Sequence, residues 1–530
     1  MASAKALRAV WSHALDIDEE EIEDSSHYAD FGGDSVTALK LVEIAPSYGI
    51  GLDVETIFTE PTFSRMLAKT KQRIDRDVKG GNNSSACANS DLIERCAKTC
   101  GLSVDQIDDV FCEPSLTTKF FLEHQESGAW LSQVVFELSS DLDVTTACRA
   151  FEAIHARNHA FRSRFVAVNE QVHNVATRLP VTWQHAVSLD EYKASDLVTK
   201  VLPGQPAVRY GLVQESEKTY IIWTALHSVH DAWTRKLLCD DLEAFLENQD
   251  EFLAQPSRPT YKSHLDRVKQ MDIETSKTLW KDYLAGLGQQ KLPTNALAQS
   301  EQPALNKMIR KHIPKQRSQD SDIRLSSVAH AALGIILGRL THCRDIAYFS
   351  IRGLRTLFPG AEAVMGAMLT NVPVRIQIRP TDTIRDLVAK VQADSISKMR
   401  HEPFGTETAR KLQLKPQDGI MFNWHTRGMG LLSRKMGRTG EQYQKGYMKV
   451  VEEQATPYAI SNILVVHDNR DRLTMELEYD DRIYSDEFMK ALAEGFSEVL
   501  HQMCVCDSTT QMQSLLETVQ SFGDGKQPGT

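Results

Sequence analysis

Residues 220–233 read YIIWTALHSVHDAW and hold the most informative pattern in the chain. The run 220–225 is apolar and rich in β-branched and aromatic residues, which predicts a buried strand. His227 and Asp231 follow with the spacing HxxxD, and residues 235–246 then have the apolar period of an amphipathic helix. A strand that delivers an imidazole into a short loop, with a carboxylate four residues later, suits a general base steadied by a nearby acid. The spacing alone is more typical of a histidine beside an ordinary aspartate.

Size and composition set wide limits on the class of protein. The chain has 530 residues, of which 42% are hydrophobic and 25% charged, and its net charge is −11. This length predicts more than one globular unit, and the acidic balance argues against a nucleic-acid partner, which would need a basic face. No apolar run is long enough to cross a bilayer, and the first residues lack the apolar core of a signal peptide. We therefore expect a soluble, cytoplasmic protein without a membrane partner.

The nine cysteines point to a reducing compartment. Cys96 and Cys100 are one helical turn apart, and Cys504 and Cys506 are two residues apart. Neither pair is joined by a second pair or by a histidine cluster at the spacing of zinc ligands. We therefore predict free thiols and no metal site.

The first seventy-odd residues predict a small helical unit. Apolar residues recur with helical spacing in 4–15, and a second helix is expected to open at Ser35. A short third helix is expected from Asp53, and Pro61 precedes a fourth at 63–71. Residues 74–90 are rich in Gly, Asn and Ser without any period, which predicts a flexible linker. A larger unit follows, with helices expected at 144–155, 235–246, 273–287 and 326–339 and strands at 130–137, 220–225 and 473–479.

Residues 32–36 read GGDSV and stand between the first two expected helices. Taken alone they predict a helix N-cap, with the glycines in the turn and Asp34 or Ser35 capping the free amides. Together with residues 57–63, IFTEPTF, the segment resembles the carrier (thiolation) domains of nonribosomal peptide synthetases over residues 4 to about 73. This resemblance implies 4′-phosphopantetheine bound covalently to Ser35, delivered from coenzyme A by a phosphopantetheinyl transferase. A helix N-terminus suits the attached phosphodiester because its amides and dipole favour negative charge.

The larger unit resembles the condensation domains of the same synthetases. Their HHxxxDG motif aligns with the loop after the strand, so that His227 falls at the catalytic second histidine and Asp231 at the structural acid. The sequence departs from the family at Leu226 for the first histidine, Ala232 for the final glycine and Thr117 for the usual glutamine. The alanine is a mild change if φ at that position is negative. Further similar segments follow in the family's order at 108–121, 157–165, 365–375 and 479–480.

The resemblance implies a small all-α four-helix carrier bundle at 1–74, a linker at 75–105 and then an α/β (α+β) condensation domain. That domain would have two lobes like those of chloramphenicol acetyltransferase, at 106–280 and 281–515, before a disordered tail at 516–530. A tunnel would cross between the lobes, with His227 at its centre as a base or as an orienting group. Asp231 would pair with Arg352 or Arg355, because an unpaired buried carboxylate is costly.

Three other features have two interpretations each. His230 and Trp233 are expected to be a bystander and a packing residue, although both stand beside the candidate base. Residues 421–425, MFNWH, predict either ordinary strand packing or a tunnel wall. The basic, glycine-containing stretch 427–445 is expected to be a surface loop rather than a nucleic-acid site.

Two classes of function follow. In the first, the chain is a synthetase fragment whose carrier holds an aminoacyl or peptidyl thioester and whose condensation domain forms an amide bond or closes a ring. Its partners would be upstream modules and carrier-bound acyl substrates, and the chain itself would be a monomer. The sequence is similar in style to fungal siderophore and cyclic-peptide synthetases, and it shows no ATP-phosphate loop of an adenylation domain. In the second class, which Leu226 and Thr117 would favour, the domain is a catalytically degenerate docking or recognition module. A coenzyme A acyltransferase with HxxxD would not explain the fused carrier.

Overall fold

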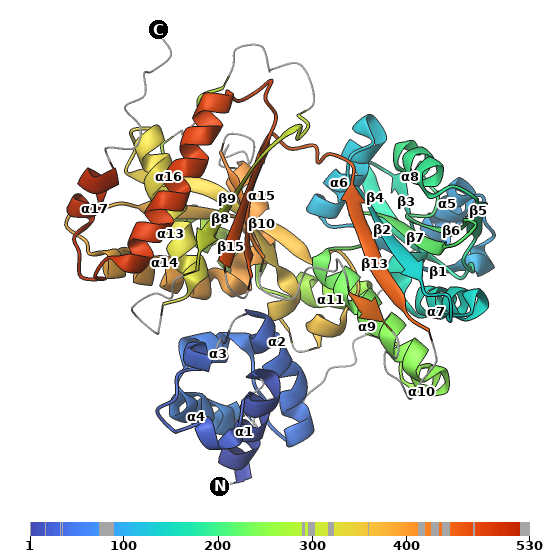
Figure 1. Ribbon diagram of the computed structural model, residues 1–530, viewed down its shortest axis with the longest axis horizontal. Helices are drawn as coiled ribbons and strands as arrows, with labels where there is room; N and C mark the ends of the chain where they lie inside the picture. Colours follow the sequence, from blue (N-terminus) through green and yellow to red (C-terminus); the bar gives the residue numbers. More distant parts are fainter. Residues whose placement is uncertain are drawn as a thin grey trace.

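The computed structural model describes residues 2–15, 17–31, 33, 35–73, 90–288, 292–294, 303–315, 323–358, 360–411, 419–425, 434–436, 446–469 and 472–519. Of the linker expected at 75–105, residues 75–89 lie outside the described residues, whereas residues 90–100 form a helix of the first lobe, because Cys96, Ala97 and Cys100 are buried against its small sheet. The described chain forms a helical bundle followed by two α/β lobes, as the sequence predicted (Figure 1).

The described residues between 2 and 73 form the predicted four-helix bundle. Its helices are α1 (Ala2–Leu15), α2 (Ser35–Ile44), α3 (Val54–Thr59) and α4 (Phe63–Arg73). Trp11 lies at the centre of the bundle core, where the rings of Tyr28, Phe31 and Phe63 meet the indole edge-on. The apolar spacing in residues 4–15 places Trp11 and its neighbours on one helix face, which explains why the bundle closes around it.

The first lobe is built on a six-stranded sheet with the order β12-β13-β2-β7-β6-β5. These strands are β2 (Leu131–Leu138), β5 (Trp183–Ala186), β6 (Val208–Gln214), β7 (Thr219–Leu226), β12 (Lys435–Met436) and β13 (Met448–Ala455). A smaller sheet has the order β1 (Ile107–Cys112), β4 (Gln171–Thr177), β3 (Ser163–Val168). The helices are α5 (Ser90–Cys100), α6 (Ser115–Ser127), α7 (Val144–Arg157), α8 (Leu189–Val198), α9 (Ala232–Glu247), α10 (Gln249–Ala254) and α11 (Tyr261–Lys269). β7 is interior to the large sheet and buried along nearly its whole length, as its apolar run predicts.

The second lobe has a sheet with the order β10-β9-β11-β14-β15-β8. Its strands are β8 (Lys307–Pro314), β9 (Asp345–Gly353), β10 (Leu369–Gln377), β11 (Met421–His425), β14 (Asn462–Asp468) and β15 (Arg472–Tyr479). Its helices are α12 (Ile273–Tyr283), α13 (Leu325–Leu340), α14 (Ile384–Lys398), the 3-10 helix η8 (Met399–Phe404), α15 (Gly405–Lys411), α16 (Asp486–Val505) and α17 (Met512–Val519). Helices α13, α14 and α16 share one large apolar core with the sheet.

The chain crosses from one lobe to the other more than once. β13 follows β11 in sequence, yet it pairs with β2 of the first lobe from Met448 to Ala455, while β11 pairs with β14 of the second lobe. The Thr456 N–H then donates to the Leu131 carbonyl at 2.9 Å. A segment of the late chain thus completes the sheet of the first lobe, next to β2.

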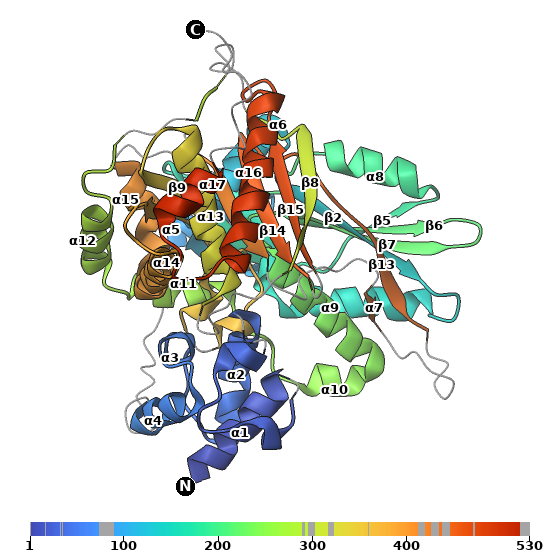
Figure 2. The same ribbon diagram turned by 60° about the vertical axis from the view of Figure 1, so that its left-hand side comes forward.

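The helical bundle lies against the junction of the two lobes (Figures 1 and 2). Arg400 on η8 donates to a Glu55 carboxylate oxygen at 2.6 Å, and the Arg324 guanidinium lies over the Phe58 ring at 4.6 Å from its centroid. Trp233 on α9 and Met399 on η8 pack against the bundle core. Both lobes therefore contact the bundle.

The structure also moves two boundaries nearer the C-terminus. The helix expected at 273–287 ends at Tyr283, and residues 516–519 of the expected tail are the last turn of α17. That turn forms because Met512 and Leu515, at helical spacing, are buried in the core of the second lobe. Residues 520–530 of the tail lie outside the described residues. Within the described chain, every helix is too short or too polar to traverse a bilayer.

Candidate functional site

The turn before α2 leaves room for a glycine alone at residue 33. The Gly33 N–H donates to the Tyr28 carbonyl at 3.1 Å, and a Cβ on Gly33 would lie 2.4 Å from the Tyr28 ring. Ser35 is the first residue of α2, where the helix amides have no partner within the helix. This close turn at a helix start fits a phosphodiester on Ser35. Asp34 and the side chain of Ser35 lie outside the described residues.

The HxxxD loop begins where β7 ends. Leu226 is the last residue of β7 and pairs with Leu131, and the next N–H, that of His227, donates to the Trp130 carbonyl at 2.8 Å. The Nδ1 atom of His227 lies 2.7 Å from the His230 carbonyl. Because a carbonyl oxygen only accepts, Nδ1 carries the proton and the lone pair of the imidazole is on Nε2.

Aromatic rings surround the His227 imidazole. Phe120 and His230 stack on it with ring centroids 5.1 and 5.0 Å away, and the rings of Trp130 and Tyr458 each lie 5.9 Å away. Burial lowers the pKa of His227, because a charged imidazolium would lose its hydration there. The imidazole is therefore neutral at pH 7 and available as a base.

Asp231 anchors the loop to the second lobe. Its carboxylate accepts the Thr234 N–H at 2.8 Å, as the N-cap of α9, and the Met368 N–H at 3.1 Å. Of the two arginines considered from sequence, Arg355 makes the ion pair, with its Nη2 3.0 Å from Oδ1 and its Nη1 bound to Oδ2. Burial raises the pKa of Asp231, but Arg355 and Thr234 outweigh it and hold the pKa below its usual value. The Asp231 carboxylate is thus charged, and both of its oxygens accept hydrogen bonds from the protein.

The departures from the family motif have mild structural consequences. Ala232 begins α9 and is not among the residues with positive φ, so an alanine there is unstrained. Leu226 is fully buried in the core of the first lobe. Thr117 lies behind the loop, where its Oγ1 donates to Glu113 at 2.6 Å and its carbonyl accepts the Ser228 hydroxyl at 2.9 Å.

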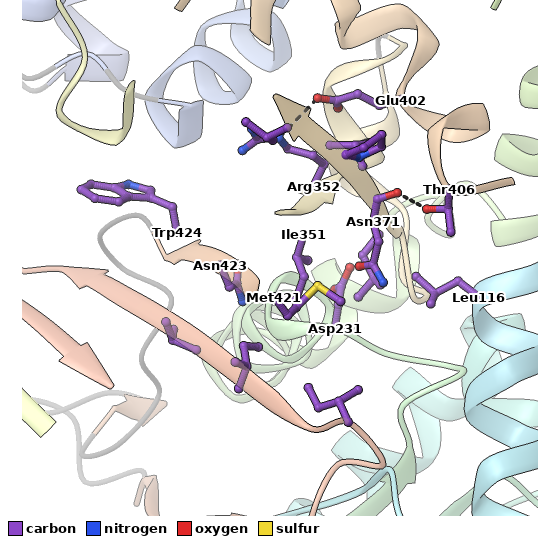
Figure 3. A pocket seen from close by; sticks show the side chains of 18 of the residues that line it. Leu116, Asp231, Ile351, Arg352, Asn371, Glu402, Thr406, Met421, Asn423 and Trp424 are labelled. Carbon is purple, nitrogen blue, oxygen red and sulfur yellow. Dashed lines mark hydrogen bonds and ion pairs between the residues drawn. The ribbon is translucent and has the colours of Figure 1, made fainter. Parts of the chain in front are cut away.

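A cavity of about 1190 Å³ runs between the lobes and reaches the carrier bundle. His227 and Asp231 line it from the first lobe, and Phe58 lines it from the bundle. Figure 3 shows further walls from the second lobe, made by Ile351 and Arg352 on β9, Asn371 on β10, Glu402 and Thr406, and Met421, Asn423 and Trp424 on β11. Segment 421–425 therefore lines the cavity with four of its five residues, which was the second interpretation of that strand, while Phe422 packs in the core of the second lobe. Of the basic stretch 427–445, only residues 434–436 are described, and they include β12.

The structure adds wall residues that sequence reasoning missed. Phe120, Trp130 and Tyr458 form the aromatic wall around His227, and Arg324 and Glu402 form a charged wall in the second lobe. Trp130 has φ of 68°, an unusual value for a bulky residue, and its indole N–H donates to Glu123 at 2.8 Å. Tyr458 follows Trp130 by more than three hundred residues in the sequence, so no local pattern could have indicated the contact between their rings.

Two family models match the chain. The model described as phosphopantetheine attachment site matches residues 5–69, and the model described as condensation domain matches residues 119–526, well over half of the chain. The second match takes in β7, the HxxxD loop and both walls of the cavity.

Similar proteins are fungal nonribosomal peptide synthetases. The synthetase gloA of Glarea lozoyensis is 24% identical over 519 residues, which cover 94% of this chain and 7% of gloA. The synthetase sidD of Aspergillus fumigatus is 25% identical over 425 residues, which cover 78% of this chain and 20% of sidD. The chain thus spans less than a quarter of the length of either relative.

Solved structures share the fold. The structure described as "The crystal structure of CT" has a TM-score of 0.65 at 17% identity, covering 82% of this chain and 98% of that one. The starter condensation domain of the rhizomide synthetase RzmA has a TM-score of 0.60 at 14% identity, covering 76% of this chain and 96% of that one. On the family matches and this shared fold, the chain belongs to the condensation domain family of nonribosomal peptide synthetases and has, ahead of that domain, a carrier domain of the kind that holds covalent 4′-phosphopantetheine.

Proposed function

We propose that the chain joins an acyl group carried on Ser35 to an amine in the cavity, forming an amide bond or closing a ring. The observation that carries this proposal is the position of His227. Its ring lines a cavity that extends to Phe58 of the carrier, and its Nδ1–H is engaged by the His230 carbonyl, so that Nε2 is left to accept a proton. When bound, the prosthetic arm supplies a flexible thiol that holds the acyl group as a thioester.

Each residue of the site has a separate role in this proposal. His227 Nε2 accepts the proton of the attacking amine or orients that amine towards the acyl carbonyl. Its neutral state at pH 7 follows from burial, which lowers its pKa. Asp231 and Arg355 hold the loop so that the imidazole keeps its place between the aromatic rings.

The proposal includes the partners and the cellular setting. The chain would receive its arm from coenzyme A through a phosphopantetheinyl transferase and its acyl groups from neighbouring synthetase modules, as part of fungal secondary metabolism such as siderophore or cyclic-peptide synthesis. All eight cysteines in the described part of the chain are free, which supports a reducing compartment and hence the cytoplasm.

The catalytic role is tested on the full chain. Ser35 is loaded from a panel of acyl-coenzyme A compounds by a phosphopantetheinyl transferase, amino acid thioesters of N-acetylcysteamine are offered as acceptors, and products are followed by mass spectrometry. We expect amide products from the wild type and a loss of about 10²–10⁴-fold in rate for His227→Ala. His185→Ala, on the exposed face of β5, is the matched control and should keep the wild-type rate.

Three outcomes separate the interpretations. Ser35→Ala should abolish the mass gain of one arm, and retention of that gain would contradict the attachment site. An unchanged rate in His227→Ala would overturn the role of the imidazole. A correctly loaded wild type that is inactive with every acceptor would instead support the docking alternative.

A further inference from the structure

Arg352 has hydrogen-bond donors to spare inside the cavity. It lies on β9, its Nη2 donates to His330 Nε2 at 3.1 Å, and its Nε–H is buried without a hydrogen-bond partner among the described residues. The carboxylate of Glu402 is 3.5 Å from that Nε, an ion-pair distance beyond a good hydrogen bond (Figure 3). A guanidinium has five N–H donors, so most of those on Arg352 are uncommitted within the described structure.

Arg324 is the second arginine with few hydrogen bonds among the described residues, and its guanidinium lies next to the carrier. It immediately precedes α13, lines the cavity, and covers the Phe58 ring of the bundle at 4.6 Å. Its Nε donates to Gln392 at 3.3 Å, which is the one hydrogen bond of its guanidinium within the part of the chain that is described. Its terminal nitrogens therefore remain available to a ligand.

The charges of this cluster do not balance. Burial lowers the pKa of Arg324 to about 10, with the nearby Arg352 adding to the effect, so Arg324 remains a cation at pH 7. Burial raises the pKa of Glu402 to about 7, although both arginines oppose this, so the carboxyl is only partly ionised. The Nε2 atom of His330 accepts a hydrogen bond from Arg352, and its Nδ1 atom lies 2.7 Å from the Tyr348 hydroxyl. Burial lowers the pKa of His330, so its imidazole is neutral at pH 7.

A further cation that lines the cavity, Lys398, has a partner of its own. Lys398 pairs with Asp394 at 3.1 Å, one helical turn away on α14. Two guanidiniums against a single, partly protonated carboxyl leave net positive charge in a partly buried cavity, which is costly without a counter-charge. Paired guanidinium donors match the geometry of a carboxylate or a phosphate.

We propose that Arg324 and Arg352 form an oxyanion subsite between the carrier and the His227 loop. This subsite rests on the proposed function and takes one of two groups with the same chemistry, the phosphodiester of the prosthetic arm or a carboxylate on the acyl substrate. Its place supports both sources, since Arg324 contacts the carrier and Arg352 is three residues from Arg355, the partner of Asp231.

The test measures binding, so it does not depend on condensation. The full chain with Ser35→Ala, which cannot take an arm, is titrated by calorimetry with 4′-phosphopantetheine and with pantetheine, which differ by the phosphate. A second pair of titrations compares the succinyl and butyryl thioesters of N-acetylcysteamine, which differ by a carboxylate. We expect at least about a tenfold preference for the anion in one of the two pairs, and that pair identifies the source.

Variants assign the preference to the two arginines. Arg324→Gln combined with Arg352→Gln should abolish it, whereas Arg149→Gln, an exposed arginine on α7, should preserve it. Glu402→Gln should strengthen it, because the competing carboxylate is removed, and this opposite sign is informative even if the double variant does not fold. Thermal unfolding of each variant verifies the folded state.

The outcomes decide the proposal without ambiguity. Equal affinities within both pairs for the parent chain would overturn the subsite, as would a preference that survives the double arginine substitution or that Glu402→Gln weakens. An added His227→Ala substitution should leave the preference unchanged. The subsite could then stand even if the proposed condensation failed, and it could fail while condensation stood.

Discussion

Two arginines three residues apart in the second lobe have opposite surroundings. The terminal nitrogens of Arg355 make five hydrogen bonds, to both carboxylate oxygens of Asp231, to the Thr234 hydroxyl and to two backbone carbonyls. Those of Arg352 make one, to His330, within the described structure. Both Nε–H groups are buried without a hydrogen-bond partner among the described residues. The difference between the two guanidiniums therefore lies in their terminal donors.

This difference separates a structural role from a binding role. A guanidinium whose terminal donors are committed to a charged carboxylate fixes two segments of the chain relative to each other. Here it fixes the HxxxD loop relative to the segment just before β10, where the Met368 N–H also donates to Asp231. A guanidinium with free donors in a cavity can do the same for a ligand. The acids differ accordingly, since the pKa of Asp231 is below its usual value and burial raises the pKa of Glu402 to about 7.

The largest expected effect comes from breaking the Arg355 pair. Arg355→Leu leaves the ionised Asp231 buried without its counter-charge, which should lower the free energy of unfolding by about 3–5 kcal/mol. Arg352→Leu is the matched comparison and should cost less, because Glu402 can take up a proton. Urea denaturation of both variants at pH 7 measures the difference, and equal losses would remove the distinction between the two arginines.

A smaller effect is expected behind the loop. Thr117→Val keeps the shape of the side chain but removes the hydroxyl that donates to Glu113 at 2.6 Å, leaving Asn174 as donor to that buried carboxyl. We expect a loss of about 1–3 kcal/mol in the free energy of unfolding. The same urea titration measures it, with the exposed Thr145→Val as control. A loss as large as that of Arg355→Leu would mean that Thr117, too, is essential to the structure around the loop.

The sequence predicted one of these two regions much better than the other. Strand, loop and helix around His227 follow from local periodicity, and the HxxxD spacing indicated both His227 and its acid, while Arg355 was one of two possible partners. The cluster of Arg324, Arg352 and Glu402 was not predicted, because its members come from β9, from the start of α13 and from η8. Only tertiary packing brings them together, and no spacing in the chain records it.

The crossing of β13 into the first lobe was missed for the same reason. Its residues pair with β2, which is some three hundred residues earlier in the chain. The aromatic wall depends on this crossing, because Tyr458 follows β13 and stacks on Trp130 with centroids 4.7 Å apart. No strand was expected at 448–455, and the long-range pairing determines the contribution of this segment to the site.

The pH dependence of binding provides a finer test of the comparison. Arg352 on β9 and Arg324 before α13 are the charged groups that face Glu402, and burial raises the pKa of its carboxyl to about 7. Raising the pH from 6 to 8 ionises Glu402, so the preference for the anion, measured with whichever of the two ligand pairs shows it, should fall relative to that of Glu402→Gln. Calorimetry at three pH values measures this difference, which also removes the ligand's own titration. Parallel pH profiles for the two proteins would contradict the role of Glu402.

The smallest effect is expected where the carrier meets η8. Arg400 donates to Glu55 at 2.6 Å and lies 3.8 Å from Asp53, but its side chain is 59% exposed. Exposed ion pairs contribute roughly 0.2–1 kcal/mol and are screened by salt, so Arg400→Gln should loosen docking by about fivefold at most. The apolar contacts of Trp233 and Met399 with the bundle remain in this variant. Amide hydrogen exchange of α3 measures the loosening.

Salt provides the control for this last prediction. Wild type in about 1 M salt, where the Debye length is about 3 Å, should resemble Arg400→Gln in low salt. The preference for an oxyanion should survive the substitution, because Arg324 and Arg352 belong to the lobes and not to the bundle. If Arg400→Gln released the carrier completely, the exposed pair and not the apolar contacts would hold the bundle. The cavity wall at Phe58 would then depend on ionic strength, and Arg324 would lose its contact with the carrier whenever salt was high.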